Sequence, residues 1–206
     1  MFFSFDGIDG VGKSTQIELF ADWLRQAGHQ VVTCRDPGGT ELGEAVRQIL
    51  LNDFATPIGR RSEMLLYMAS RAQLVDQVIR PALERGQAVV SDRYLLANVV
   101  YQGYAGGLDV ATLWQIGRTA TDGIEPDLTF LLDMPLDKAR ARMTRELDRM
   151  EQQDDAFRQR LRAGFLAEAA RQPERIAVID ASGPPEQVQG LIRRAAQASK
   201  VGQAIA

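Results

Sequence analysis

Residues 7–14 are Gly-Ile-Asp-Gly-Val-Gly-Lys-Ser, which matches the phosphate-binding pattern G-x-x-x-x-G-K-[ST] at every fixed position. The glycines let the backbone turn tightly and present successive N–H groups to an anion. Lys13 carries a charge that can reach the outer phosphates, and the Ser14 hydroxyl can bind the magnesium ion of a nucleoside triphosphate. The stretch therefore predicts a triphosphate site.

The neighbouring sequence favours this interpretation over a chance glycine-rich turn. The apolar run Phe2–Phe5 precedes the loop, as expected of a buried strand, and residues 16–25 carry apolar side chains at helical spacing. A strand, a glycine loop and a helix are the context that the pattern needs, because the helix N-terminus adds its dipole to the phosphate site.

Composition limits the class of protein. The 206 residues fit one domain, or one domain with a lid, and a net charge of -3 argues weakly against a nucleic-acid coat or a membrane-surface binder. Cys34 is the single cysteine, so no internal disulfide can form, and His29 follows a helix-ending glycine, where a catalytic role is not expected. We expect a cytoplasmic protein that binds neither nucleic acid nor membrane.

Strand and helix patterns alternate along the chain. Short apolar runs indicate buried parallel strands at Phe2–Phe5, Val31–Cys34, Ala88–Ser91, Leu128–Leu132 and Ile176–Ile179. Amphipathic stretches indicate helices at Glu41–Leu51, Ser62–Arg85, Val110–Thr121, Leu136–Met143 and Ala156–Arg171. The alternation predicts an α/β fold of the P-loop NTPase type, with a five-stranded parallel sheet between two helical layers. We expect the ligands at the C-terminal strand ends, and the last residues, 199–206, to fray.

Two further features indicate phosphoryl transfer. Asp92-Arg93-Tyr94 follows an apolar strand, where a carboxylate can hold magnesium and an arginine can bind phosphate, and this placement favours a functional role over a surface ion pair. Residues 140–162 are crowded with arginines and acids, which usually means a solvated helix. Beside a triphosphate loop, we interpret residues 142–155 as an arginine-rich lid that closes over the phosphates.

The chain resembles bacterial thymidylate kinases over almost its whole length. The resemblance rests on Phe5-Asp6-Gly7-Ile8-Asp9-Gly10, Arg35-Asp36-Pro37-Gly38-Gly39-Thr40, Tyr67-Met68-Ala69-Ser70-Arg71, Asp92-Arg93-Tyr94 with Tyr101-Gln102-Gly103, and Glu146-Leu147-Asp148-Arg149-Met150-Glu151. It implies transfer of the ATP γ-phosphoryl group to dTMP, with Mg²⁺ as cofactor, in a homodimer. Another nucleoside monophosphate kinase, or a nucleotide switch, remains as an alternative; the guanine motif Asn-Lys-x-Asp of many switches is absent.

The resemblance also implies roles for individual residues. The ATP-binding residues would be Gly7, Ile8, Asp9, Gly10, Val11, Gly12, Lys13, Ser14 and Thr15. The dTMP-binding residues would be Asp9, Asp36, Pro37, Arg47, Tyr67, Arg71, Arg93, Asn98, Tyr101 and Gln102. The catalytic cations would be Lys13, Arg93, Arg145 and Arg149, with Arg142 a weaker candidate, and the metal ligands would be Ser14 and Asp92. Ala181-Ser182-Gly183 would border the adenine.

Within the implied base pocket, Tyr67 would stack on thymine and Arg71, at i+4 on the same helix face, would donate to thymine O4. Without the resemblance, we would interpret Tyr67 as an aromatic residue at the edge of the core and Arg71 as a surface cation. Tyr101 would exclude a ribose 2′-hydroxyl, and Asp9 would contact the 3′-hydroxyl or the magnesium shell.

Three positions distinguish this chain within the family that it resembles. Gly10 stands where some members carry an arginine, so the catalytic cation is expected from the lid. Asp36 stands where glutamate is common, and Tyr67 where phenylalanine is usual. For the homodimer, the apolar stripe of Val110–Thr121 with Trp114 could supply the interface, or it could serve the core.

Overall fold

The computed structural model describes residues 1–52, 54, 56–143 and 154–205. Its centre is a five-stranded, all-parallel sheet in the order β2-β3-β1-β4-β5. The strands are β1 (Phe2–Asp6), β2 (Val31–Arg35), β3 (Ala88–Asp92), β4 (Leu128–Asp133) and β5 (Ile176–Asp180). All five predicted strands are confirmed, and each extends one residue further at its C-terminal end.

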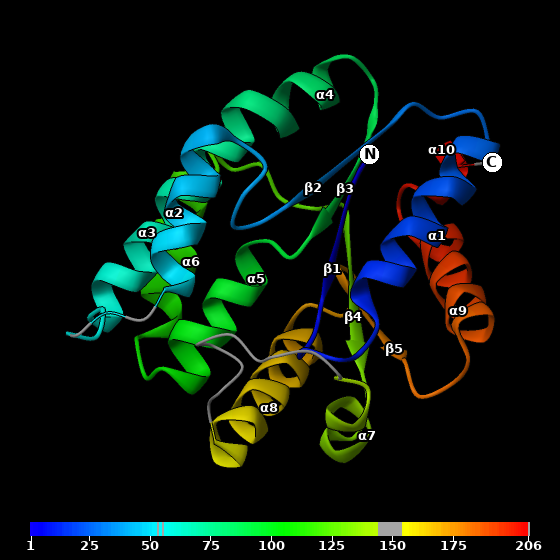
Figure 1. Cartoon of the computed structure of the whole chain (residues 1–206). Coiled ribbons are helices and arrows are strands. Elements are labelled where there is room, and N and C mark those ends of the chain that lie inside the picture. The colour runs from blue at the N-terminus through cyan, green and yellow to red at the C-terminus, as the bar shows by residue number, and fades with distance from the viewer. Residues whose placement is uncertain (53, 55, 144–153, 206) are drawn as a thin grey trace.

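Helices cover both faces of the sheet, as predicted (Figure 1). On the face to the right in Figure 1 lie α1 (Lys13–Gln26) and α9 (Pro185–Ala198), with α10 (Gly202–Ile205) beside them. The helices drawn to the left of the sheet, above it or below it are α2 (Glu41–Leu51), α3 (Arg60–Leu74), α4 (Arg80–Glu84), α5 (Leu95–Asn98), α6 (Val110–Ala120), α7 (Leu136–Ala141) and α8 (Asp155–Arg171).

The alternation of side chains along β1 explains the two layers. Phe3 and Phe5 are buried and pack edge-on against Phe20 of α1, while Phe2 turns to the opposite face and packs against Tyr94. Successive residues of a strand point to opposite faces, so β1 anchors a helix layer on each side. This burial fixes the central strand that leads into the glycine loop.

Two turns of wider, π-helical geometry interrupt the helices that flank the cleft. The expected helix Ser62–Arg85 is divided by η1 (Val75–Ile79), which immediately precedes α4 and its Pro81. Proline cannot donate to the helix and clashes with the preceding turn, and the widened turn accommodates it. The second, η2 (Val99–Ala105), continues α5. The sequence did not predict η2 or α9.

The chain end is more ordered than expected. Gly202 and Ile205 of α10 are buried, and α10 packs on α9, so the prediction that residues 199–206 fray is wrong for the described residues up to 205. Ile205 joins the main hydrophobic core, which holds the segment in place. In the described part of the chain, no helix has the length and apolar character needed to cross a membrane.

Candidate active site

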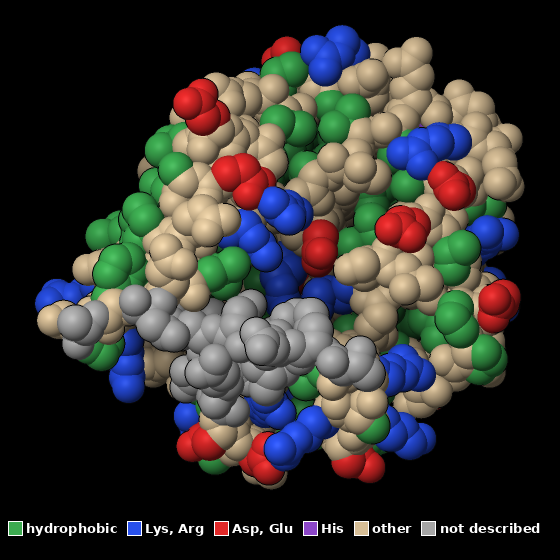
Figure 2. Space-filling view, viewed as in Figure 1, with side chains coloured by type: hydrophobic (Ala, Val, Ile, Leu, Met, Phe, Trp, Pro, Cys, Tyr) green, Lys and Arg blue, Asp and Glu red, His purple; other side chains and the backbone are tan. Residues whose placement is uncertain are grey.

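A cleft of about 660 Å³ opens at the C-terminal edge of the sheet, which is the volume of a small-molecule site. Lys and Arg side chains line the hollow in Figure 2. The predicted site residues that line it are Asp9, Gly10, Gly12, Lys13, Ser14, Thr15, Asp36, Pro37, Arg47, Tyr67, Arg71, Asp92, Arg93, Asn98, Tyr101 and Gln102. Strand ends and helices far apart in the sequence thus meet around one space.

The glycine loop wraps around the side chain of Lys13. Gly7, Gly10 and Gly12 all have positive φ, which residues with a Cβ rarely adopt. The Lys13 ammonium donates to the carbonyl oxygens of Gly7 at 3.1 Å and Ile8 at 2.9 Å. Burial and the nearby Arg93 charge lower the pKa of Lys13. The loop therefore holds a cation at its centre, ready for anionic groups.

Two of the predicted ATP-binding residues turn their side chains into the core and not into the cleft. The side chains of Ile8 and Val11 are buried in the main hydrophobic core, so they face away from the cleft. Ser14 and Thr15 are exposed at the start of α1, where their hydroxyls border the cleft.

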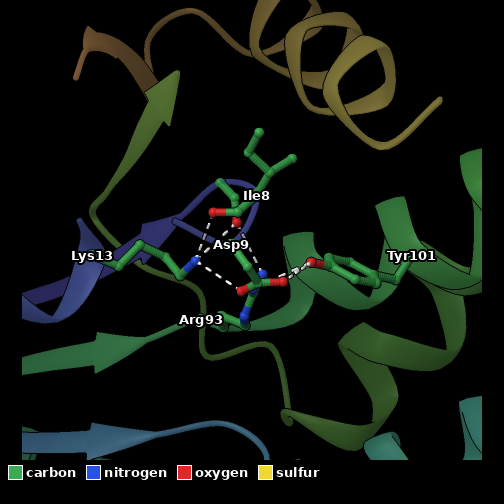
Figure 3. Close-up of polar contacts among 6 residues, drawn as sticks. Ile8, Asp9, Lys13, Arg93 and Tyr101 are labelled. Carbon is green, nitrogen blue, oxygen red and sulfur yellow. Dashed lines mark hydrogen bonds and ion pairs between the residues drawn. The ribbon is translucent and has the colours of Figure 1, made fainter. Parts of the chain in front are cut away.

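Asp9 joins the loop to the opposite wall of the cleft (Figure 3). One Asp9 carboxylate oxygen accepts from Arg93 Nη2 at 2.5 Å, and the other accepts from the Tyr101 hydroxyl at 3.1 Å. Arg93 also donates to the Gly7 carbonyl at 3.1 Å and lies over the Tyr101 ring at 5.1 Å. Burial alone would raise the pKa of Asp9, but the charges of Arg93 and Lys13 lower it below its usual range.

Arg93 is held in a backbone conformation that is uncommon for its type. Its φ is 65°, in the left-handed region, and its N–H donates to the Phe5 carbonyl at 2.9 Å. Burial alone would lower its pKa, but Tyr101 and Asp9 raise it well above the usual value. The guanidinium therefore stays charged in the wall of the cleft, where it is partly buried.

At the strand ends lie buried carboxylate oxygens that have no hydrogen-bond partner in the described part of the chain. They belong to Asp6, which ends β1, to Asp92, which ends β3, and to Asp36, which follows β2. Asp6 is fully buried, and burial raises its pKa from 3.8 to about 7. Such oxygens are acceptors that a bound cation or its water shell could satisfy.

A network of polar side chains forms the far end of the cleft. Arg71 is 1% exposed, and its Nε donates to Asp36 at 2.5 Å while its Nη1 donates to Asn98 Oδ1 at 3.0 Å. Asn98 donates to Gln102 at 2.6 Å. Tyr67 lies one helical turn before Arg71 and borders the same space. The surface cation that the residues alone would have suggested for Arg71 is therefore wrong, and the structure buries it in the cleft wall.

Two more predicted residues are anchored at the rim. Arg47 of α2 donates to the Pro37 carbonyl at 3.0 Å, which places its guanidinium beside Asp36-Pro37. Arg142 donates to the carbonyls of Ala181 at 3.1 Å and Ser182 at 3.3 Å, so it closes the cleft against the segment expected to border adenine. Arg145 and Arg149 lie outside the described residues.

Sequence reasoning gave no role to two residues of the site. Asp6 belongs to one of the polar strand ends that the sequence predicts. Only the fold shows that its carboxylate is buried among the charges of the cleft. Glu63 accepts from Gln102 Nε2 at 2.9 Å. The sequence feature that could have indicated a role for Glu63 is its position one helical turn before Tyr67, on the same face of α3.

The helix expected to offer an interface is largely committed to the core. Trp114 of α6 is partly buried and donates from Nε1 to Glu168 of α8 at 3.1 Å, and Leu113 is buried. These contacts therefore support the alternative that the apolar stripe of Val110–Thr121 packs into the core of the protein.

The family model, the related sequences and the solved structure that match this chain all belong to one family. The thymidylate kinase family model matches residues 5–192. A thymidylate kinase of Rhodopirellula baltica is 48% identical over 89% of this chain and 74% of its own length, and one of an Exiguobacterium species is 46% identical over 92% and 90%. The crystal structure of a thymidylate kinase from Ehrlichia chaffeensis superposes with a TM-score of 0.79 at 30% identity, covering 94% of this chain and 97% of its own.

Proposed function

The chain belongs to the thymidylate kinase family, and on that premise we propose how its cleft transfers the γ-phosphoryl group of ATP to dTMP. The observation that carries the proposal is the position of Arg93. Its guanidinium bonds to the Gly7 carbonyl and Asp9 of the glycine loop and to the Tyr101 hydroxyl of the opposite wall. One partly buried cation therefore stands between the proposed donor and acceptor sites.

The loop residues 7–15 would hold the ATP phosphates through backbone N–H groups, with Lys13 beside them. Ser14 and Asp92 would hold Mg²⁺, and the unpartnered Asp92 Oδ1 fits this role. The described residues contain no cluster of three or more acidic, His or Cys side chains able to hold a metal. This suits Mg²⁺, which keeps several waters and binds chiefly to one or two carboxylates and substrate phosphates. When bound, the ion would neutralise phosphate charge.

At the acceptor side, dTMP would lie with its base on Tyr67 and its phosphate near Arg47 and Arg93. The ring of Tyr101 would close the sugar's 2′ side, and Asp9 would receive the 3′-hydroxyl. Arg71 would donate to thymine O4, because Nε and Nη1 have acceptors in Asp36 and Asn98 and Nη2 has none among the described residues. A donor without a partner beside the cleft favours a base that offers an acceptor.

Catalysis would consist of alignment and charge neutralisation. A phosphate oxygen of dTMP is already an anionic nucleophile, so no side chain has to remove a proton. Lys13 and Arg93, together with Arg145 and Arg149 of the lid, would spread the charge that develops on the transferring group. Arg142 would support the adenine side through the carbonyls that it binds.

A coupled assay of ADP release tests the proposal. The enzyme is given ATP and, in turn, dTMP, dUMP, dCMP, AMP and GMP. We expect dTMP to be preferred over dCMP by a large factor and over dUMP by less, since one methyl group is worth about 1–3 kcal/mol in a pocket. Equal turnover of dCMP would remove Arg71 from its proposed role.

We also propose that the chain acts as a cytoplasmic homodimer, with α2 and α3 at the interface in place of α6. Leu42 and Ile49 of α2 and Leu65 of α3 are 48%, 41% and 54% exposed. Figure 2 shows hydrophobic side chains over these two helices. Size-exclusion chromatography with light scattering would test this: Leu65→Lys should yield monomers, and an unchanged mass would contradict the choice of surface.

A further inference from the structure

Glu63 ends an unbroken chain of hydrogen bonds that runs through the proposed base pocket. Gln102 Nε2 donates to Glu63 Oε1 at 2.9 Å, and Asn98 Nδ2 donates to Gln102 Oε1 at 2.6 Å. Arg71 Nη1 then donates to Asn98 Oδ1 at 3.0 Å. Every donor in this chain points toward Glu63, so the amides have one common orientation.

The chain connects two secondary-structure segments around the base. Glu63 and Arg71 lie at i and i+8 of α3, with Tyr67 between them on the same face. Asn98 and Gln102 lie at i and i+4 on α5 and η2. Arg71, Asn98 and Gln102 are each no more than 2% exposed. Water therefore has little access to replace a lost partner, and the orientation of each amide matters.

The two ends of the chain fix the amide orientations for different reasons. An arginine can only donate, so Asn98 must turn its oxygen toward Arg71. A carboxylate side chain accepts, so Gln102 must turn its NH₂ toward Glu63 and its oxygen toward Asn98. Rotation of both amides would set a carbonyl oxygen against Glu63 and an NH₂ group against Arg71. Arg71 at one end of the chain and Glu63 at the other therefore both oppose rotation of the two amides.

This orientation gives the pocket edge a donor from Arg71 next to an acceptor from Asn98. Thymine offers the complement, with the acceptor O4 next to the donor N3–H. Cytosine offers the reverse, a donor at N4 and an acceptor at N3, and it would fit better if the Asn98 amide rotated. Such a rotation also requires Gln102 to rotate, which Glu63 opposes.

We propose that Glu63 is a positioning residue that holds the Gln102 and Asn98 amides in the orientation that selects thymine over cytosine. The inference rests on the proposed function, since it needs the pyrimidine to bind between Tyr67 and Asn98. Glu63 itself acts through Gln102 rather than on the base.

The test is Glu63→Gln, which keeps the shape of the side chain but can donate as well as accept. We expect the ratio of kcat/KM for dTMP over dCMP to fall by about 5-fold to 100-fold, the range for relieving one buried mismatch of polar groups. Most of the change should come from a lower KM for dCMP, and the effect on dCMP should be larger than that on dTMP. Glu41→Gln is the matched control, because Glu41 is also a first-turn helix glutamate and is exposed. Its ratio should equal that of the wild type.

A second measurement isolates the route through Gln102. In a Gln102→Leu background the chain is already cut, so adding Glu63→Gln should leave the ratio unchanged. If Glu63→Gln slows both substrates equally, or shifts the ratio equally in both backgrounds, Glu63 has only a structural role and the inference is wrong. If the wild type itself turns over dCMP as fast as dTMP, the proposed base pocket fails instead.

Discussion

Replacing Asp6 by asparagine should make the free energy of unfolding less dependent on pH. Asp6 ends the central strand β1, directly before the glycine loop, and is fully buried. Neither of its carboxylate oxygens has a hydrogen-bond partner among the described residues, and burial raises its pKa from 3.8 to about 7, against the opposing charges of Arg93 and Lys13. The folded protein therefore prefers the protonated acid more strongly than the unfolded chain does.

The sign and size of the effect follow from this difference. Because the pKa is higher in the folded state, its contribution to stability is fully present below pH 3.8 and is lost as the pH rises to about 7. Each pKa unit corresponds to about 1.4 kcal/mol, so the ionised group costs the folded state about 4 kcal/mol above pH 7. Between pH 5 and pH 8, about 3 kcal/mol of that loss should appear in the wild type.

Urea unfolding of the nucleotide-free protein at several pH values between 5 and 8 measures the difference. Asp6→Asn should lack the slope that Asp6 contributes, so its stability relative to the wild type should rise with pH. Asp22→Asn is the control, because it removes the same charge from the surface of α1, where the Asp22 side chain is 63% exposed. Wild type and Asp6→Asn curves that run parallel from pH 5 to pH 8 would refute the reasoning.

Three other substitutions test the loop and the lid. Lys13→Ala should leave the melting temperature nearly unchanged but reduce dTMP turnover by about 100-fold or more, the loss typical of a removed charge-stabilising donor; near-normal turnover would exclude Lys13 from catalysis. Arg149→Ala should lower kcat more than it raises the KM for dTMP, and a pure KM effect would move Arg149 to substrate binding. A Cβ at Gly10 would lie 2.2 Å from the Ala139 carbonyl oxygen, whereas one at Gly28 would meet nothing within 4 Å, although both have positive φ. Gly10→Ala should therefore reduce the free energy of unfolding by about 1–3 kcal/mol more than Gly28→Ala, and equal losses in denaturant melts would contradict the close packing of α7 on the loop.

The elements that the sequence predicted best are those whose environment is uniform. The inner strands β1, β3 and β4 are short apolar runs because they are buried on both faces of the sheet. The edge strands β2 and β5 are partly exposed, but they too are short and mainly apolar. The loop was predictable because its glycines and Lys13 each satisfy a local backbone or charge requirement. The convergence of Asp9, Asp36 and Asp92 followed from the rule that ligands bind at the C-terminal strand ends.

What the sequence did not reveal depends on contacts between distant residues. Arg71 and Asp36 are 35 positions apart, and no local pattern shows that they form a buried ion pair. Glu63 shares a face of α3 with Tyr67 and Arg71, but only its contact with Gln102 shows what it does in the site. The order of α10 likewise depends on the burial of Ile205 in a core built from strands and helices elsewhere in the chain.

The balance of charge in the cleft explains why it needs cations from its rim and lid. Carboxylates and cations alternate at the inner end, which contains Asp6, Asp9, Asp36, Asp92, Lys13, Arg71 and Arg93. The inner site therefore sets carboxylates beside its cations and does not offer the substrates cations alone. ATP and dTMP together bring several negative charges into this partly buried space, where uncompensated charge is costly. We expect Mg²⁺ and the rim residues Arg47 and Arg142 to compensate these charges when the substrates bind. The proposed lid arginines would act on the additional charge that develops on the transferring phosphoryl group, and we therefore expect substitutions in the lid to lower kcat more than they raise KM.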